Sequence, residues 1–226
     1  MRTPAVVTGF LVVVNVLVFL WEIVTIGPGM FSGNIPDPNA YYNAGALVPL
    51  AVTQNHEYWR IITSAFLHAN LMHIGFNMFA LWIFGRFIEA ALGSPRMLFV
   101  YAVSLVASGL SVVYFSPPDV ATLGASGAIF GLIGALFAIG FKFGKHGMDL
   151  VRANLPMLIL NLIFTFAFPN ISWQAHVGGL LAGFVVTFAI YFPPKRVRPE
   201  VVDVGGGTIL DAEYQEPPEN ASRAGS

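Results

Sequence analysis

Four polar side chains in this chain have the types and the spacing needed for acyl-transfer chemistry: His73, Asn77, Ser126 and His176. A serine hydroxyl is a weak nucleophile until a base within hydrogen-bond reach takes its proton, and histidine suits that task near neutral pH. The tetrahedral intermediate needs hydrogen-bond donors, which the Asn77 amide, the His73 imidazole and the backbone N–H of Ser126 can supply. Because no Asp or Glu accompanies these residues, we predict a Ser126–His176 dyad rather than a triad.

The elements that must position these residues are membrane helices. Of the 226 residues, 56% are hydrophobic and 10% are charged, whereas soluble domains carry about a quarter charged residues. Six segments have the length and apolar character to cross a bilayer: 6–26, 71–91, 97–115, 126–143, 155–168 with its flanks, and 173–192. The predicted fold class is therefore an all-α polytopic membrane protein.

The basic residues predict how these helices are oriented. If the N-terminus is cytoplasmic, every inside loop carries Lys or Arg, while the outside loops carry only Arg60. This pattern predicts six spans with both termini in the cytoplasm. The second, fourth and sixth helices then run in the same direction, and the four polar side chains all lie within about two turns of the outer ends.

A shared depth changes how these side chains are interpreted. Taken alone, a serine in a membrane helix is usually a packing residue, and a lone histidine is as often structural as catalytic. Polar groups at membrane depth cost free energy, however, and chance would scatter them through the bilayer. Four such groups from three helices in one layer favour a functional site.

Small residues predict how two of the helices meet. The fourth helix has Gly127 and Gly131 at a spacing of four, followed by Ala135, and the sixth has Gly179 and Gly183. Such stripes allow the backbones of membrane helices to approach closely. Packing the two stripes together would bring the Ser126 hydroxyl near the His176 imidazole.

Two regions lie outside the predicted bundle. In the first loop, residues 27–61, aromatic side chains that include Tyr41, Tyr42, Tyr58 and Trp59 predict a partly interfacial position. Residues 193–226 are polar and glycine-rich, which predicts a disordered cytoplasmic tail. The membrane domain is therefore expected to occupy residues 1–192.

The sequence resembles the rhomboid intramembrane serine proteases over residues 6–192. The nucleophile motif GxSG of that family corresponds to residues 124–127, the histidine motif AHxxG to 175–179, the HxxxN motif to 73–77 and the Trp-Arg pair to 59–60. The order of the motifs and the six-helix topology also agree. The resemblance implies a rhomboid-like bundle that cleaves transmembrane protein substrates at the outer side of a lipid bilayer, without metal or cofactor. A bacterial cell membrane is the expected location.

The resemblance also implies roles for individual residues. Ser126 is the expected nucleophile and His176 the expected base, with His73, Asn77 and the Ser126 backbone at the oxyanion hole. The supporting positions are Trp59, Arg60, Gly124, Gly127, Gly179, Gly183 and Phe130. Phe130 replaces a tyrosine of well-known members, and its ring can still stack on the histidine. His68 matches a histidine that some members carry.

Other functions fit these residues less well. The alternative is a catalytically idle rhomboid-like protein that binds membrane clients. The segment His56–Arg60 begins like a zinc-binding HExxH motif, but Arg60 occupies the place of the second histidine. The predicted spans contain no Asp, which excludes an aspartic protease. The sequence also shows no internal repeat of the kind on which many transporters are built, which argues against a transporter. A net charge of −1 argues against nucleic-acid binding.

Overall fold

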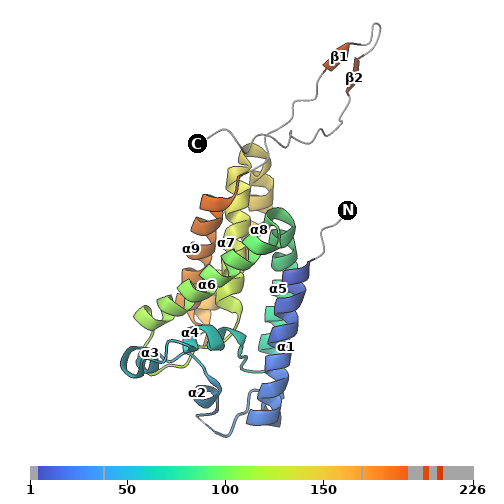
Figure 1. Cartoon of the computed structure of the whole chain (residues 1–226). Coiled ribbons are helices and arrows are strands. Elements are labelled where there is room, and N and C mark those ends of the chain that lie inside the picture. The colour runs from blue at the N-terminus through green and yellow to red at the C-terminus, as the bar shows by residue number, and fades with distance from the viewer. Residues whose placement is uncertain (1–4, 38, 169, 193–200, 204–207, 211–226) are drawn as a thin grey trace, which may run out of the picture. The chain divides into compact units, whose positions relative to one another are not determined.

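The computed structural model describes residues 5–37, 39–168, 170–192, 201–203 and 208–210. Long helices dominate the part before residue 193, which forms one compact unit (Figure 1). The helices are α1 (Val6–Ile26), α2 (Ala40–Ala44), α3 (Pro49–Asn55), α4 (Arg60–Thr63), α5 (Leu71–Leu92), α6 (Ser94–Phe115), α7 (Ser126–Lys142), α8 (Met148–Ala167) and α9 (Trp173–Ile190), with 3-10 turns η1 (Pro28–Phe31), η2 (Ser64–Phe66) and η3 (Gly144–His146).

The six long helices confirm the predicted all-α membrane fold. By length and composition, α1, α5, α6, α8 and α9 can cross a membrane, and α7 is a shorter apolar helix. The 17 residues of α7 span only about 25 Å, less than the hydrocarbon core of a bilayer. Residues 127–140 of this helix are all buried, so protein rather than lipid surrounds it. A short, enclosed helix can begin below the membrane surface, and α7 begins at Ser126.

Glycines let α7 and α9 pack with their backbones in contact. A Cβ on Gly179 would overlap the carbonyl oxygen of Gly127 and lie 2.7 Å from its carbonyl carbon. One turn further on, a Cβ on Gly183 would overlap the Gly131 carbonyl in the same way. Any larger side chain at these positions would force the helices apart, because neither obstacle is a movable side chain.

Two buried carboxylates tie α1 to the rest of the bundle. Glu89 of α5 accepts hydrogen bonds from the backbone N–H groups of Val7 and Thr8, both at 2.9 Å, from the Thr8 hydroxyl at 2.7 Å, and from the Ser94 hydroxyl at 2.6 Å. Toward the other end of α1, Glu22 accepts from the His68 backbone N–H at 3.1 Å. Each carboxylate therefore satisfies backbone donors that lipid could not.

Arg60 holds the first loop together from inside. Its side chain is buried between the Tyr42 and Trp59 rings, at 4.0 and 4.5 Å from their centroids. It pairs with Glu57 and donates to the carbonyl oxygens of Tyr42 and Ala46 at 2.7 and 3.0 Å. The Trp-Arg pair thus shapes the loop, and the glutamate of the HExxH-like segment is one side of an ion pair.

The structure corrects the prediction for the fifth helix. The span is predicted over 155–168 with its flanks, and the N-terminal flank proves to be about two helical turns long, because α8 begins at Met148 and runs through Pro156. Its first turns hold Asp149 and Arg152, which form an exposed ion pair at 3.3 Å. The expectation that no span carries an Asp is therefore wrong, although Asp149 lies at the exposed end. Charged residues lower the hydropathy of a helix end without preventing helix formation.

The C-terminal region contains the one pair of strands found in the described residues. β1 (Val201–Asp203) and β2 (Thr208–Leu210) pair antiparallel, with Val202 opposite Ile209. These six residues lie in the tail for which disorder is predicted, and the disorder of that tail stays a prediction. The remainder of the tail, for which disorder was also predicted, lies outside the described residues.

Candidate active site

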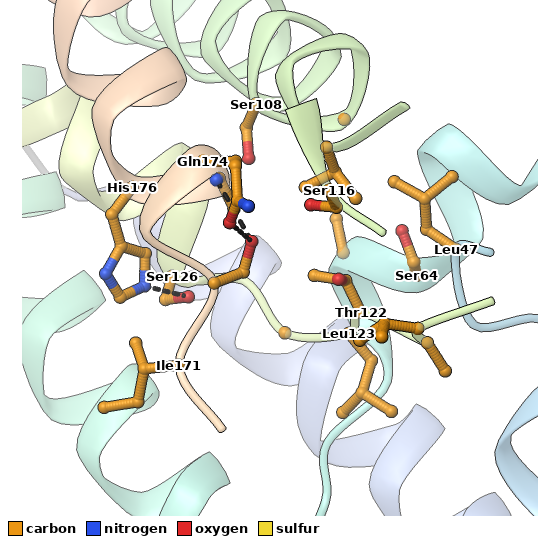
Figure 2. A pocket seen from close by; sticks show the side chains of 18 of the residues that line it. Leu47, Ser64, Ser108, Ser116, Thr122, Leu123, Ser126, Ile171, Gln174 and His176 are labelled. Atoms are coloured by element: carbon orange, nitrogen blue, oxygen red, sulfur yellow. Dashed lines mark hydrogen bonds between the residues drawn. The ribbon is translucent and has the colours of Figure 1, made fainter. Parts of the chain in front are cut away.

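The Ser126 hydroxyl and the His176 imidazole meet at the start of two packed helices. Ser126 Oγ lies 2.8 Å from His176 Nε2, and Figure 2 shows the two side chains facing each other. Ser126 is the first residue of α7, and His176 lies in the first turn of α9. The Ser172 hydroxyl accepts from the Ala175 backbone N–H at 3.2 Å and so caps α9. The distance permits direct proton transfer between hydroxyl and imidazole.

Phe130 supports the imidazole from one side. It follows Ser126 by one helical turn, and its ring stacks on that of His176 with centroids 4.1 Å apart and planes 12° apart. Phe130 lies on α7, and its side chain is itself buried. The stacking restricts rotation of the imidazole about its χ2 angle without any hydroxyl group.

His73 lies beside the serine and has one ring nitrogen available. Its Nδ1 accepts the Ala69 backbone N–H at 3.2 Å, so the neutral ring carries its proton on Nε2. A Cβ on Gly124 would lie 2.9 Å from that Nε2 and 3.8 Å from Ser126 Oγ. Gly124 also has φ of +123°, so space and backbone conformation both require glycine there. The His73 N–H therefore points into the region next to the nucleophile.

Asn77 is oriented differently from the sequence-based expectation. Its amide Nδ2 donates to the His73 carbonyl oxygen at 2.9 Å, one turn back on α5. Asn77 is buried and is absent from the residues that line the pocket at Ser126. The structure thus brings Ser126, His176 and His73 together, while the Asn77 amide bonds to its own helix.

The segment before Ser126 is held by the first loop. Leu47 and Thr122 form an antiparallel bridge, with N–H to carbonyl distances of 2.9 and 2.8 Å. The Gly124 N–H donates to the Ser64 carbonyl at 2.8 Å. Together these segments border a pocket of about 520 Å³, and Figure 2 shows Ser126 and His176 among the residues that line it. His73 lines the same pocket. Trp59 and Arg60 lie outside this lining, and their side-chain contacts are within the first loop.

His68 packs against His73 behind the site. The two rings meet edge to face with centroids 5.2 Å apart, and His68 Nδ1 lies 3.2 Å from the Phe66 carbonyl oxygen. Burial lowers the pKa of His68 to about 3, and electrostatic repulsion by the nearby His73 is the second, smaller cause. His68 is therefore a neutral packing and hydrogen-bonding residue at ordinary pH.

Two further polar residues at the site were missed by sequence reasoning. Gln174 lines the pocket (Figure 2). Its side chain accepts from the Ser172 hydroxyl at 3.3 Å and donates to the Phe115 carbonyl oxygen at 3.1 Å. Thr165 of α8 lies 2.8 Å from His176 Nδ1. Thr165 lies near the C-terminal end of a helix antiparallel to α7, so the depth argument applied to Ser126 would also have selected it.

The arrangement offers a nucleophile, a base and polar donors, and it contains no cluster of metal ligands. Across the described residues, no group of three His, Asp or Glu side chains is placed to hold a metal ion. The chemistry available to these residues is acyl transfer through Ser126.

Comparison with known proteins finds a matching family model and relatives whose names agree with it. Residues 55–192 match the family model of the Rhomboid domain. Rhomboid protease GluP of Bacillus subtilis is 36% identical over 157 residues, covering 67% of this chain and 31% of the relative. Putative rhomboid protease YdcA of the same organism is 36% identical over 135 residues, covering 59% of this chain and 68% of the relative. Rhomboid protease GlpG of Yersinia pseudotuberculosis is 34% identical over 143 residues, covering 62% of this chain and 51% of the relative.

Proposed function

The chain belongs to the rhomboid family, and from that premise we propose that it is a serine-type intramembrane protease. Its reaction is hydrolysis of peptide bonds in or beside the transmembrane segments of other membrane proteins. The observation that carries the proposal is the 2.8 Å distance between Ser126 Oγ and His176 Nε2, at a pocket within a bundle of membrane helices. This pairing is what a Ser-His dyad requires, so it favours a protease over the catalytically idle alternative.

The reaction proceeds in two steps. Ser126 Oγ attacks the carbonyl carbon while its proton passes to His176 Nε2, and the C–N bond then breaks as the leaving amine takes that proton. The acyl group remains as an ester on Ser126. In the second step a water molecule attacks the ester, His176 accepts and returns the proton, and the new carboxyl terminus is released.

The oxyanion is stabilised by donors already directed at the pocket. The His73 Nε2–H is one donor, because its Nδ1 is engaged by the Ala69 backbone N–H. The Ser126 backbone N–H is a second, since the first N–H groups of a helix have no acceptor within it. The Asn77 amide becomes a third only if it leaves the His73 carbonyl when substrate binds.

The substrate and the membrane orientation follow from the position of the site. A helical backbone engages its own carbonyls, so a transmembrane substrate must unwind locally, and Gly or Pro near the cleaved bond favours this. The distribution of Lys and Arg supports cytoplasmic termini, with the pocket toward the opposite side of the membrane. We place the protein in a bacterial cell membrane.

The test is proteolysis by the reconstituted protein, with a single-pass substrate and a metal chelator throughout. Wild type should cut, Ser126→Ala should not, and Ser116→Ala should cut normally because Ser116 lines the pocket without bonding to His176. A serine-reactive fluorophosphonate should label the wild-type protein and should not label Ser126→Ala. Equal cleavage by wild type and Ser126→Ala would refute the mechanism. Absence of both cleavage and labelling in wild type would favour the idle alternative.

A further inference from the structure

The second ring nitrogen of His176 has a partner on another helix. His176 Nδ1 lies 2.8 Å from the Thr165 hydroxyl oxygen of α8, and both groups are buried. Thr165 and Val151 are the two residues of α8 that are buried, while the rest of this helix is intermediate or exposed. A buried hydroxyl on a helix whose side chains are mostly exposed or half-buried therefore lies beside the imidazole.

The position of the hydroxyl proton determines which tautomer His176 adopts. Thr165 Oγ1 lies 2.7 Å from the Asn161 carbonyl oxygen, one turn back on α8. A carbonyl oxygen only accepts, so the single hydroxyl proton of Thr165 is donated there. Oγ1 can then only accept from His176, which must carry its proton on Nδ1. The Nε2 lone pair is left facing the Ser126 hydroxyl, which is the form a general base requires.

We infer that Thr165 is a positioning residue that selects the reactive tautomer of His176 and holds the imidazole against Ser126. This inference rests on the proposed function and extends its dyad to the linked series Asn161 carbonyl, Thr165, His176 and Ser126. Thr165 makes no contact with substrate. It takes no proton during the reaction and stabilises the imidazolium formed after serine attack, because the Nδ1–H bond to oxygen strengthens when the ring is charged.

The inference makes catalysis dependent on the position of α8. Phe130 restrains the plane of the imidazole, but a stacked ring does not distinguish Nδ1 from Nε2. Only a hydrogen bond selects the tautomer, and in the described residues the partner of Nδ1 comes from α8. A change that displaces α8 by the width of one hydrogen bond should lower turnover even if α7 and α9 stay in place.

Three variants separate positioning from packing. Thr165→Val keeps the shape of the side chain and removes the hydroxyl, whereas Thr165→Ser keeps the hydroxyl. Thr187→Val is the matched control, because Thr187 is equally buried on α9 and its hydroxyl has no partner among the described groups. We expect Thr165→Val to lower kcat by about tenfold or more with little change in KM, since a correctly oriented general base contributes about 10²–10⁴-fold. Thr165→Ser and Thr187→Val should resemble wild type.

NMR shifts of the imidazole ring nitrogens give a readout that does not depend on activity. In histidine-labelled protein, the signals of His176 are identified by their loss in His176→Ala. Wild type should show a protonated Nδ1 and an unprotonated Nε2, and Thr165→Val should show a mixture of tautomers. A protonated Nε2 in wild type would overturn the inference, as would equal kcat for Thr165→Val and wild type. If Ser126→Ala cleaves like wild type, the proposed function fails, while the tautomer measurement still decides the role of Thr165.

Discussion

Replacing Gly179 with alanine should separate α7 from α9 and disconnect His176 from Ser126. The added methyl carbon would lie 2.7 Å from the Gly127 carbonyl carbon and would overlap its oxygen. Non-bonded carbon atoms prefer about 3.5–4.0 Å, so the helices must move apart by about 1 Å. Neither partner can yield by a rotamer change, because both obstacles are backbone atoms.

The expected loss follows from the dyad geometry. His176 lies one turn before Gly179 on α9, and Ser126 directly precedes Gly127 on α7. A displacement of about 1 Å would lengthen the 2.8 Å contact between Oγ and Nε2 to about 3.8 Å, beyond hydrogen-bond range. A misplacement of this size costs about 10²-fold in rate. Overpacking should also lower the free energy of unfolding by about 1–3 kcal/mol.

The assay is cleavage of a transmembrane substrate in liposomes, together with fluorophosphonate labelling and thermal unfolding in detergent. Gly9→Ala on α1 is the matched control, because no atom lies within 4 Å of the Cβ it would gain. Alanine has the higher helix propensity, so that control should be as stable as wild type or more so. If Gly179→Ala retained wild-type cleavage and stability, the backbone contact would not position the dyad, and the reasoning would be refuted.

Two other predictions concern the rings around the site. Phe130→Ala should lower kcat by about tenfold because the imidazole loses the ring stacked at 4.1 Å, whereas Phe130→Tyr should stay close to wild type; equal rates for alanine and wild type would contradict this. The pKa of His68 is lowered to about 3 by burial, from an ordinary value near 6.5, so between these pH values the unfolded chain binds more protons than the folded one. The contribution of neutral His68 to the free energy of unfolding is fully present above pH 6.5. As the pH falls from 6.5 toward 3, the free energy of unfolding should decrease by about 1.4 kcal/mol per pH unit. The matching variant is His68→Asn, because an asparagine amide can replace the hydrogen bond of Nδ1. Thermal unfolding measured against pH should give this variant a slope smaller by about 1.4 kcal/mol per pH unit than that of wild type. Equal slopes for the two proteins would contradict the lowered pKa of His68.

The helices and the core of the site were predictable for one physical reason. Lipid requires about 20 apolar residues and internal backbone hydrogen bonds from each span, so hydropathy identifies the segments. Against such a background a polar side chain is conspicuous, which is why Ser126, His176 and His73 could be selected. The structure brings these three residues to one pocket.

Other features depended on directional contacts that no single segment contains. The Asn77 amide is predicted to donate to the oxyanion, and Asn77 lies four residues after His73 on the same face of α5, but the amide donates to the His73 backbone carbonyl one turn back. Spacing along a helix determines the face, and only the surroundings determine the rotamer. The sequence left the start of α8 open for a related reason, since Asp149 and Arg152 lower hydropathy at an exposed helix end.

By itself, the sequence determined that this chain forms a membrane helix bundle and which residues could carry acyl-transfer chemistry. Both are properties of individual residues, set by the free energy of transferring each side chain into lipid and by its acid-base chemistry. Only the tertiary structure decided that Thr165 is the partner of His176 Nδ1 and that Glu22 accepts from His68. These contacts depend on how neighbouring helices are rotated and shifted against one another, and close packing across glycine backbones sets that alignment to within about 1 Å.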